Sequence, residues 1–193
     1  MLSVAEILYL HSFLKSNKMR VHQLTLFIAF ATSILFSCNS LSPEKTFEIA
    51  VLNSNMIVGF ASDRLSRELE SPSVKLVENN RTETMKRTEV IQSKIDFSEE
   101  VLGKLKGMKE TDDTKEMINA SIAVYEYILP VYKTEYQQLA KLFDENASEE
   151  SIRTQTQAIH DRHYQKFDQH YNNLINVGKG FAQRHNITVN WAE

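Results

Sequence analysis

Apolar residues recur at steps of three and four along most of the chain, which is the spacing of an amphipathic helix. The pattern predicts four helices, over residues 43–70, 74–105, 114–143 and 149–186. The second helix has an alternative start near Asn80, because residues 78–84 are polar on every side. Helices that each expose one apolar stripe bury it best against one another. We therefore predict an all-α fold, an antiparallel four-helix bundle with up-down-up-down connections.

Local signals mark the ends and the irregular points of these helices. Ser42 and Ser148 stand where an N-cap is expected, and Asp113 with Glu116 three residues later has the form of a capping box. Pro130 lies inside the third helix, where it lacks the amide that would bond the carbonyl of the preceding turn. We predict a kink at Pro130 in one continuous helix, because the apolar stripe is the same on both sides of it.

The end of the chain carries two glycines and the single tryptophan. Gly178 and Gly180 are expected to loosen the last helix near its end. Residues 187–191 alternate in the manner of a short strand, but the predicted fold offers this strand no partner. We therefore expect Trp191 to dock against the end of the bundle.

A continuous apolar block precedes the periodic part of the chain. It begins at Leu24 and is apolar for about thirteen residues, which suits a secretory signal peptide and falls short of the roughly twenty residues of a membrane-spanning helix. A short positive region precedes the block, at Lys18, Arg20 and His22. The only cysteine of the chain closes it, in the sequence Leu35-Phe36-Ser37-Cys38. This ending resembles the lipobox of bacterial lipoproteins, with an aliphatic residue three before the cysteine and a small residue directly before it.

The resemblance to bacterial lipoproteins divides the chain into three parts. It implies that residues 1–37 are a signal peptide and that Cys38 receives lipid, which would anchor the protein to a membrane without crossing it. Residues 38–42 would then be a short tether, and residues 43–193 the helical domain. Residues 1–18 either lengthen the signal peptide or precede the true start of translation.

The residues after the cysteine indicate which membrane is expected. Asn39 stands where the aspartate that commonly retains lipoproteins in the inner membrane would be, so the resemblance implies the outer membrane. An acidic run of the kind that directs some lipoproteins to the cell surface does not follow Cys38. We therefore favour the periplasmic face, with the cell surface as the alternative.

Composition excludes one class of partner. The chain has a net charge of −3, and removing residues 1–37 leaves 19 basic and 24 acidic residues, a net charge of about −5. Nucleic-acid binding needs a basic face, so we do not expect a nucleic-acid partner. Only five glycines and three prolines occur in the chain, which favours helices over hairpins.

Histidines are concentrated in the last predicted helix. A metal site there would use His160, His163 and His170, which share one side of the helix. Further ligands would be Asp161 or Asp168, with Glu126, Tyr125 or Glu135 from the third helix. However, the Glu-x-x-His pairs of dinuclear bundles and the Cys-x-x-Cys-His sequence of c-type haem sites do not occur. The simpler interpretation leaves His163 and His170 half-buried, each with one nitrogen bonded to a tyrosine or a carbonyl, and His160 and His185 solvated.

Tyrosines are concentrated in the third and fourth predicted helices, which hold six of the seven. They suit packing at the edge of the core or a partner surface, for which the candidates are Tyr127, Tyr136, Tyr164 and Tyr171. The sequence contains no nucleophile elbow or phosphate-binding loop, so we expect no enzymatic activity and no cofactor. We predict an envelope lipoprotein whose bundle binds an envelope protein or a small ligand. The alternative is a metal- or haem-binding bundle that uses the three histidines.

Overall fold

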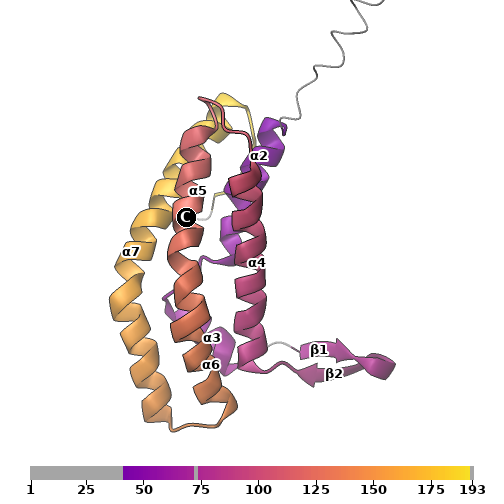
Figure 1. The fold of residues 1–193 in the computed structure, drawn as a ribbon, viewed down its shortest axis with the longest axis vertical. Helices are drawn as coiled ribbons and strands as arrows, with labels where there is room; N and C mark the ends of the chain where they lie inside the picture. The colour runs from indigo at the N-terminus through magenta and orange to yellow at the C-terminus, as the bar shows by residue number, and fades with distance from the viewer. Residues whose placement is uncertain (1–40, 72–73, 192–193) are drawn as a thin grey trace, which may run out of the picture. The chain divides into compact units, whose positions relative to one another are not determined.

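Three long helical segments run antiparallel through the protein and form its main body (Figure 1). The computed structural model describes residues 41–71 and 74–191. The three segments are α4 (Arg87–Gly107), then α5 (Lys115–Val131) continued by η3 (Tyr132–Tyr136) and α6 (Gln137–Asp144), and finally α7 (Glu149–Arg184). The prediction of a mainly helical fold is confirmed for these residues. None of the helices in this part of the chain has an apolar stretch of the length that a bilayer span requires.

The N-terminal part of the described chain is a broken segment and not one helix, so the prediction of a helix over 43–70 is wrong. It consists of α2 (Pro43–Ala50), the 3₁₀ helix η1 (Leu52–Met56) and α3 (Asp63–Glu70). The buried Ser54 hydroxyl donates to the Val51 carbonyl at 2.7 Å, which competes with regular helical bonding. Ala61 has a φ of 51°, in the left-handed region, and directs the chain into α3. Ser62 then caps α3, because its hydroxyl accepts from the Arg64 amide.

A β-hairpin replaces the predicted start of the second helix, at residue 74 and at the alternative near Asn80. Strands β1 (Val74–Val77) and β2 (Arg81–Thr84) pair antiparallel across the three-residue turn η2 (Glu78–Asn80). Asn79 and Asn80 have φ values of 61° and 56°, a conformation that asparagine tolerates better than most residues. The turn therefore forms without the Asn-Gly or Asp-Gly pair that commonly marks a tight hairpin. The helix begins only at Arg87.

Pro130 is accommodated within one helical path. The chain continues in the same direction from α5 through η3 into α6 (Figure 1), as predicted from the shared apolar stripe. A π-helical segment, η3, starts two residues after the proline, and the kink at Pro130 stays a prediction. Thr134 donates its hydroxyl to the Pro130 carbonyl at 2.8 Å.

The predicted helix caps are confirmed in part. Ser42 and Ser148 accept hydrogen bonds from the amides of Lys45 and Ser151, as predicted. The capping box at Asp113 is wrong, because α5 begins at Lys115 and Thr114 precedes it without a side-chain cap. Asp113 instead pairs with Arg184 and His185 at the end of α7.

The N-terminal helix packs against the C-terminal end of α7. The rings of Phe47 and Phe181 stack at 6.3 Å, and Trp191 lies edge-on to Phe47 at 6.0 Å, so the predicted docking of Trp191 is confirmed. Gly178 is buried, and a Cβ added to it would lie 2.9 Å from Cγ2 of Val51. Gly178 and Gly180 do not loosen the helix, since α7 continues to Arg184; Gly178 lets α2 approach closely.

Candidate functional site

Phe60, in the turn between η1 and α3, lies at the centre of an aromatic cluster. Its ring is completely buried and packs tilted or edge-on to its aromatic neighbours. The ring centroids around it lie between 5.0 and 6.4 Å away and belong to Phe167, Tyr132, Tyr136, Tyr127 and His163. The cluster therefore fixes the irregular N-terminal segment against α5, η3 and α7.

The π-helix η3 supplies two adjacent polar side chains that bind different elements. Tyr136 is 2% exposed, and its hydroxyl accepts a hydrogen bond of 2.9 Å from the Ala61 amide. Glu135, the preceding residue, extends to His163 on α7. π-Helical turns occur often at functional sites, because the extra residue redirects the side chains around it.

His163 connects Tyr127 on α5 with Glu135 on η3. Its Nε2 lies 2.8 Å from Oε1 of Glu135, and its Nδ1 lies 3.0 Å from the Tyr127 hydroxyl. A carboxylate only accepts, so Nε2 carries a hydrogen and donates it to Glu135. In a neutral imidazole Nδ1 then accepts from the tyrosine, whereas in an imidazolium both nitrogens donate. The side chains of His163 and Glu135 are 15% and 21% exposed, so the chain of bonds is largely shielded from water.

Arg162 places a positive charge next to the Glu135 carboxylate. Its Nη1 lies 3.1 Å from Oε2 of Glu135, which is the distance of an ion pair. The same Oε2 is buried and receives no well-directed hydrogen bond from the described residues. We attribute the contact to charge attraction, because the guanidinium approaches outside hydrogen-bonding geometry. Arg162 is more than half exposed, which limits the strength of this pair.

The environment of Tyr127 opposes ionisation of its hydroxyl. Burial, and then the nearby Glu135 carboxylate, raise the pKa of Tyr127 above its ordinary value. The phenol therefore stays protonated at neutral pH and serves as a hydrogen-bond partner, not as a nucleophile. We interpret the Tyr127, His163 and Glu135 series as a connection between helices.

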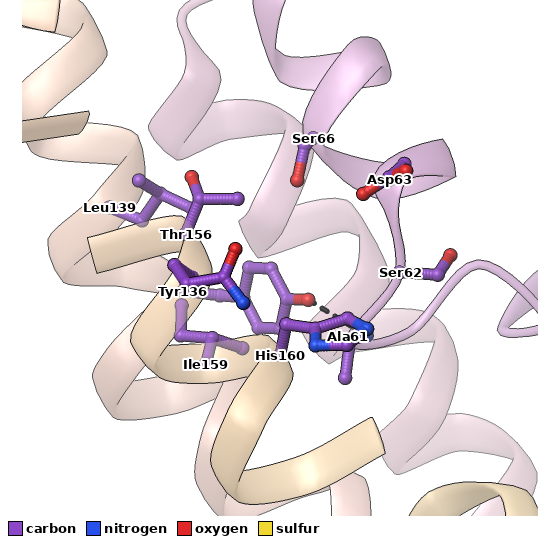
Figure 2. A pocket seen from close by; sticks show the side chains of 10 residues that line it. Ala61, Ser62, Asp63, Ser66, Tyr136, Leu139, Thr156, Ile159 and His160 are labelled. Carbon is purple, nitrogen blue, oxygen red and sulfur yellow. Dashed lines mark hydrogen bonds between the residues drawn. The ribbon is translucent and has the colours of Figure 1, made fainter. Parts of the chain in front are cut away.

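A cavity of about 200 Å³ opens beside this cluster, between α3, the η3–α6 segment and α7 (Figure 2). Ser62, Asp63 and Ser66 line it from the start of α3, and Thr156, Gln157 and His160 from α7. Ala61, Tyr136, Leu139 and Ile159 complete the lining. Figure 2 shows the Tyr136 hydroxyl bonded to Ala61 at the wall of the cavity. The cavity thus has hydroxyl, amide and imidazole groups above an apolar base.

Two further cavities lie next to each other beside Met56, the last residue of η1. Each is lined by Met56, Glu68 and Lys94, and their volumes are about 290 and 230 Å³. Lys94 pairs with Glu68 at 3.0 Å. The second of these cavities also contacts Ser93 and Phe97 and has a mostly apolar lining. Because their volumes are similar to that of the cavity in Figure 2, substitutions in these cavities serve as controls for substitutions in that one.

The three histidines that were predicted as metal ligands contact different partners in the structure. His163 uses both ring nitrogens within the protein, and His160 stacks on Tyr164 with its Nδ1 3.4 Å from Asp161. His170 packs against the Tyr127 ring, and burial followed by nearby Lys166 lowers its pKa. Within residues 41–71 and 74–191, no group of three His, Cys, Asp or Glu side chains is placed to hold a metal.

The simpler interpretation of the histidines is correct at His163 and wrong at His185. His163 is half-buried and bonds a tyrosine, as that interpretation expected. His185 packs on Phe181 at 4.3 Å and bonds Asp113, so it is not simply solvated. Glu135, considered as a metal ligand, instead accepts from His163.

The four tyrosines of the predicted partner surface occupy different environments. Tyr164 is 43% exposed and stacks on His160, while Tyr127 and Tyr171 are half-buried. Tyr136 is in the core, so its assignment to an exposed surface is corrected. Its ring and hydroxyl are used by Phe60 and Ala61.

Sequence reasoning missed the part of the cavity that α3 contributes. A single helix over 43–70 would have kept Ser62 and Ser66 on its surface, away from α7. The available signal was Ser62 followed by Asp63, which has the form of an N-cap and an acidic first turn. Thr156 lies inside the predicted helix over 149–186, and its hydroxyl was not considered as part of a site.

No family model matches the chain, and no curated protein or solved structure matches it either. The predicted signal peptide, the lipobox-like sequence with Cys38 and most of the predicted tether lie outside the described residues. The site must therefore be interpreted from its own chemistry.

Proposed function

We propose that this protein is a lipid-anchored envelope protein whose helical domain binds a small, neutral, hydroxyl-bearing ligand and does not transform it. The observation that carries the proposal is the cavity in Figure 2, where polar groups from two helices surround an apolar base. Pockets of this kind fix a ligand by a few placed hydrogen bonds. A sugar or a similar polyol presents both the hydroxyls and the apolar face that this lining complements.

The charges around the cavity favour a neutral ligand over an anionic one. The lining carries the Asp63 carboxylate, and none of its described residues is a lysine or arginine. A phosphate or carboxylate ligand would be repelled by Asp63 and would lack a charged partner. Ser66, Thr156 and Gln157 can each both donate and accept, as hydroxylated ligands require.

The proposal of a non-enzymatic function rests on the position of the titratable groups. Tyr127, His163 and Glu135 do not line the cavity, and their hydrogen bonds are used between helices. Among the described residues that line the cavity, His160 is the only histidine, the residue type that most often acts as a catalytic base. Catalysis would need a base together with a group that orients it toward the ligand.

The bundle itself is also part of the proposal. We infer an up-down-up-down four-helix plan in which the first segment is broken into α2, η1 and α3. The support is the direction of the chain in Figure 1, where α4, the α5–α6 segment and α7 alternate. The break in the first segment creates the cavity, because α3 begins at the level of Tyr136.

Ligand binding is tested with the full chain purified from membranes in detergent. Titration calorimetry with D-glucose, D-galactose and N-acetyl-D-glucosamine should detect binding of at least one sugar. Ser66→Leu fills the cavity and should weaken that binding at least tenfold. Ser93→Leu, which places the same side chain in the neighbouring apolar cavity, should leave it unchanged. Equal binding by Ser66→Leu, or stronger binding of glucose 6-phosphate than of glucose, would contradict the proposal.

The lipid anchor is tested separately in the native host. Metabolic labelling with a palmitate analogue should mark the wild-type protein, and Cys38→Ala should abolish the label and change the fractionation of the protein. Ser37→Gly, which keeps a small residue before the cysteine, is the matched control and should keep the label. A label that persists in Cys38→Ala shows that the anchor is not at this cysteine.

A further inference from the structure

The β1–β2 hairpin projects from the main body at the start of α4 (Figure 1). Its sheet contains two strands within the described residues, so the outer edge of β2 has no neighbouring strand there. All four residues of β2 are exposed, and Val74 and Leu76 of β1 are 62% and 71% exposed. An open strand edge beside exposed apolar side chains is a template for pairing with another strand.

The register assigns each side chain of the hairpin to one of two faces. Val74 is opposite Thr84 and Leu76 is opposite Thr82, so these four side chains share one face. The other face carries Lys75, Val77, Arg81 and Glu83. The Lys75 ammonium bonds Glu89 on α4, which turns the charged face toward α4 and the apolar face away from it.

The sequence of β2 is self-complementary in an antiparallel arrangement. When Thr82 lies opposite Thr82 of a second copy, Arg81 lies opposite Glu83 and Glu83 lies opposite Arg81. Opposite charges at directly facing positions stabilise a strand pair, and like charges destabilise it. The outer edge of β1 lacks this property. An antiparallel pair of β1 strands with its axis at Lys75 places two ammonium groups opposite each other, and one with its axis at Leu76 places Lys75 opposite Val77.

We infer that β2 pairs antiparallel with β2 of a second copy of this chain, about a two-fold axis at Thr82. The result is a four-stranded sheet whose central pair carries two crossed Arg81–Glu83 contacts. Leu76 and Thr82 from both copies then form one continuous apolar face. Two-fold pairing of identical surfaces is the commonest form of association between copies of one protein.

The small size of the β2–β2 contact determines the affinity that we expect for the dimer. A pair of four-residue strands buries far less surface than stable interfaces do, which bury at least about 1,200 Å² in total. The dimer should therefore be weak in dilute solution and should form at high protein concentration. This inference does not depend on the ligand cavity, which lies between other elements.

Cysteine cross-linking of the full chain locates the contact. Thr82→Cys places a thiol on the proposed axis, where the two copies approach within disulfide range. Leu76→Cys is the matched control, because it lies opposite Thr82 on the same face and at the outer edge of β1. Thr82→Cys should cross-link at least tenfold faster than Leu76→Cys, and the wild-type chain supplies the background from Cys38. Equal rates, or a faster rate for Leu76→Cys, would overturn the inference.

Charge reversal tests the register with a rescue. Arg81→Glu alone and Glu83→Arg alone each place like charges opposite each other in a homodimer, so each should lose the Thr82→Cys cross-link. A mixture of the two variants, with one of them tagged, should restore it, because every facing pair is then oppositely charged. Rescue of the mixture also shows that neither variant has lost its hairpin. Failure of the mixture to cross-link would reject the two-fold pairing at Thr82, and cross-linking to a different protein instead would assign the edge to another partner.

Discussion

The Tyr136 hydroxyl accepts a hydrogen bond of 2.9 Å from the amide of Ala61, a residue 75 positions earlier in the chain. Both groups are buried, and Ala61 holds a φ of 51° that alanine adopts only at a cost. Tyr136 belongs to the π-helical segment, and Ala61 precedes the cap of α3. This bond therefore joins the two irregular backbone segments that shape the cavity.

Removal of the Tyr136 hydroxyl should destabilise the fold. Tyr136→Phe keeps the ring in the Phe60 cluster and leaves the buried Ala61 amide without its acceptor. We expect a loss of about 1–3 kcal/mol in the free energy of unfolding, the cost of an unsatisfied buried donor. Chemical denaturation measures this loss. Tyr164→Phe, at an exposed position, should change the free energy by less than about 0.5 kcal/mol.

Glycine at position 61 should stabilise the protein. Ala61→Gly removes the left-handed strain of about 1–2 kcal/mol, and the greater freedom of glycine in the unfolded chain offsets about half of this. The expected net gain is up to about 1 kcal/mol. Ala158→Gly, inside α7, is the comparison and should lose about 1 kcal/mol through helix propensity. A loss of stability in Ala61→Gly would show that the lost burial of the Ala61 methyl group outweighs the relief of backbone strain.

Two glycine-to-alanine replacements should have opposite signs. Gly103 has no atom within 4 Å of an added Cβ, so Gly103→Ala should stabilise α4 by about 1 kcal/mol. Gly178→Ala would bring its Cβ to 2.9 Å from Cγ2 of Val51, whose branched side chain moves little. Overpacking of about 1–3 kcal/mol should exceed the gain in propensity. Thermal unfolding should give a higher Tm for the first variant and a lower Tm for the second.

Asp144 should contribute stability that depends on pH. Its burial disfavours the charged form, but hydrogen bonds from the Thr88 and Arg87 amides and the Thr88 hydroxyl outweigh this and leave the pKa of Asp144 lowered. A carboxyl with a lower pKa in the folded state stabilises the fold above its unfolded pKa of about 3.9. That contribution is lost as the pH falls through the folded pKa.

The pH dependence is measured against Asp144→Ala. At pH 7 this variant should be less stable by about 0.5–2 kcal/mol, the usual value of an N-terminal cap. The difference should persist down to about pH 4 and shrink at lower pH, where the wild-type carboxyl also becomes protonated. A difference that stays constant down to pH 2 would show that Asp144 acts without its charge.

The sequence predicted the parts of the fold that depend on local signals. Ser148 marked the start of α7, and the shared stripe across Pro130 indicated one helical path, as the structure shows. The hairpin was missed because its turn uses two asparagines in the left-handed conformation, its strands are short, and β2 is entirely polar. A polar run without a turn dipeptide does not distinguish a strand from a helix start.

The candidate site was predicted less well, because it depends on a tertiary bond. The partner of His163 was anticipated as a tyrosine or a carbonyl, but its identity as Tyr127 required the packing of α5 on α7. The break before α3 could not be inferred from Ala61, which is a good helix former. The Tyr136 hydroxyl stabilises the conformation at Ala61 from far along the sequence, and no local rule contains that information.

The packing of Phe47 and Val51 on α7 determines when the domain can be completed during synthesis. Their partners Gly178, Phe181 and Trp191 lie more than 120 positions later in the chain. During synthesis, α2 must therefore wait with an uncovered apolar face until the end of α7 has left the ribosome. In a cell, this delay keeps α2 accessible to chaperones until α7 has been made.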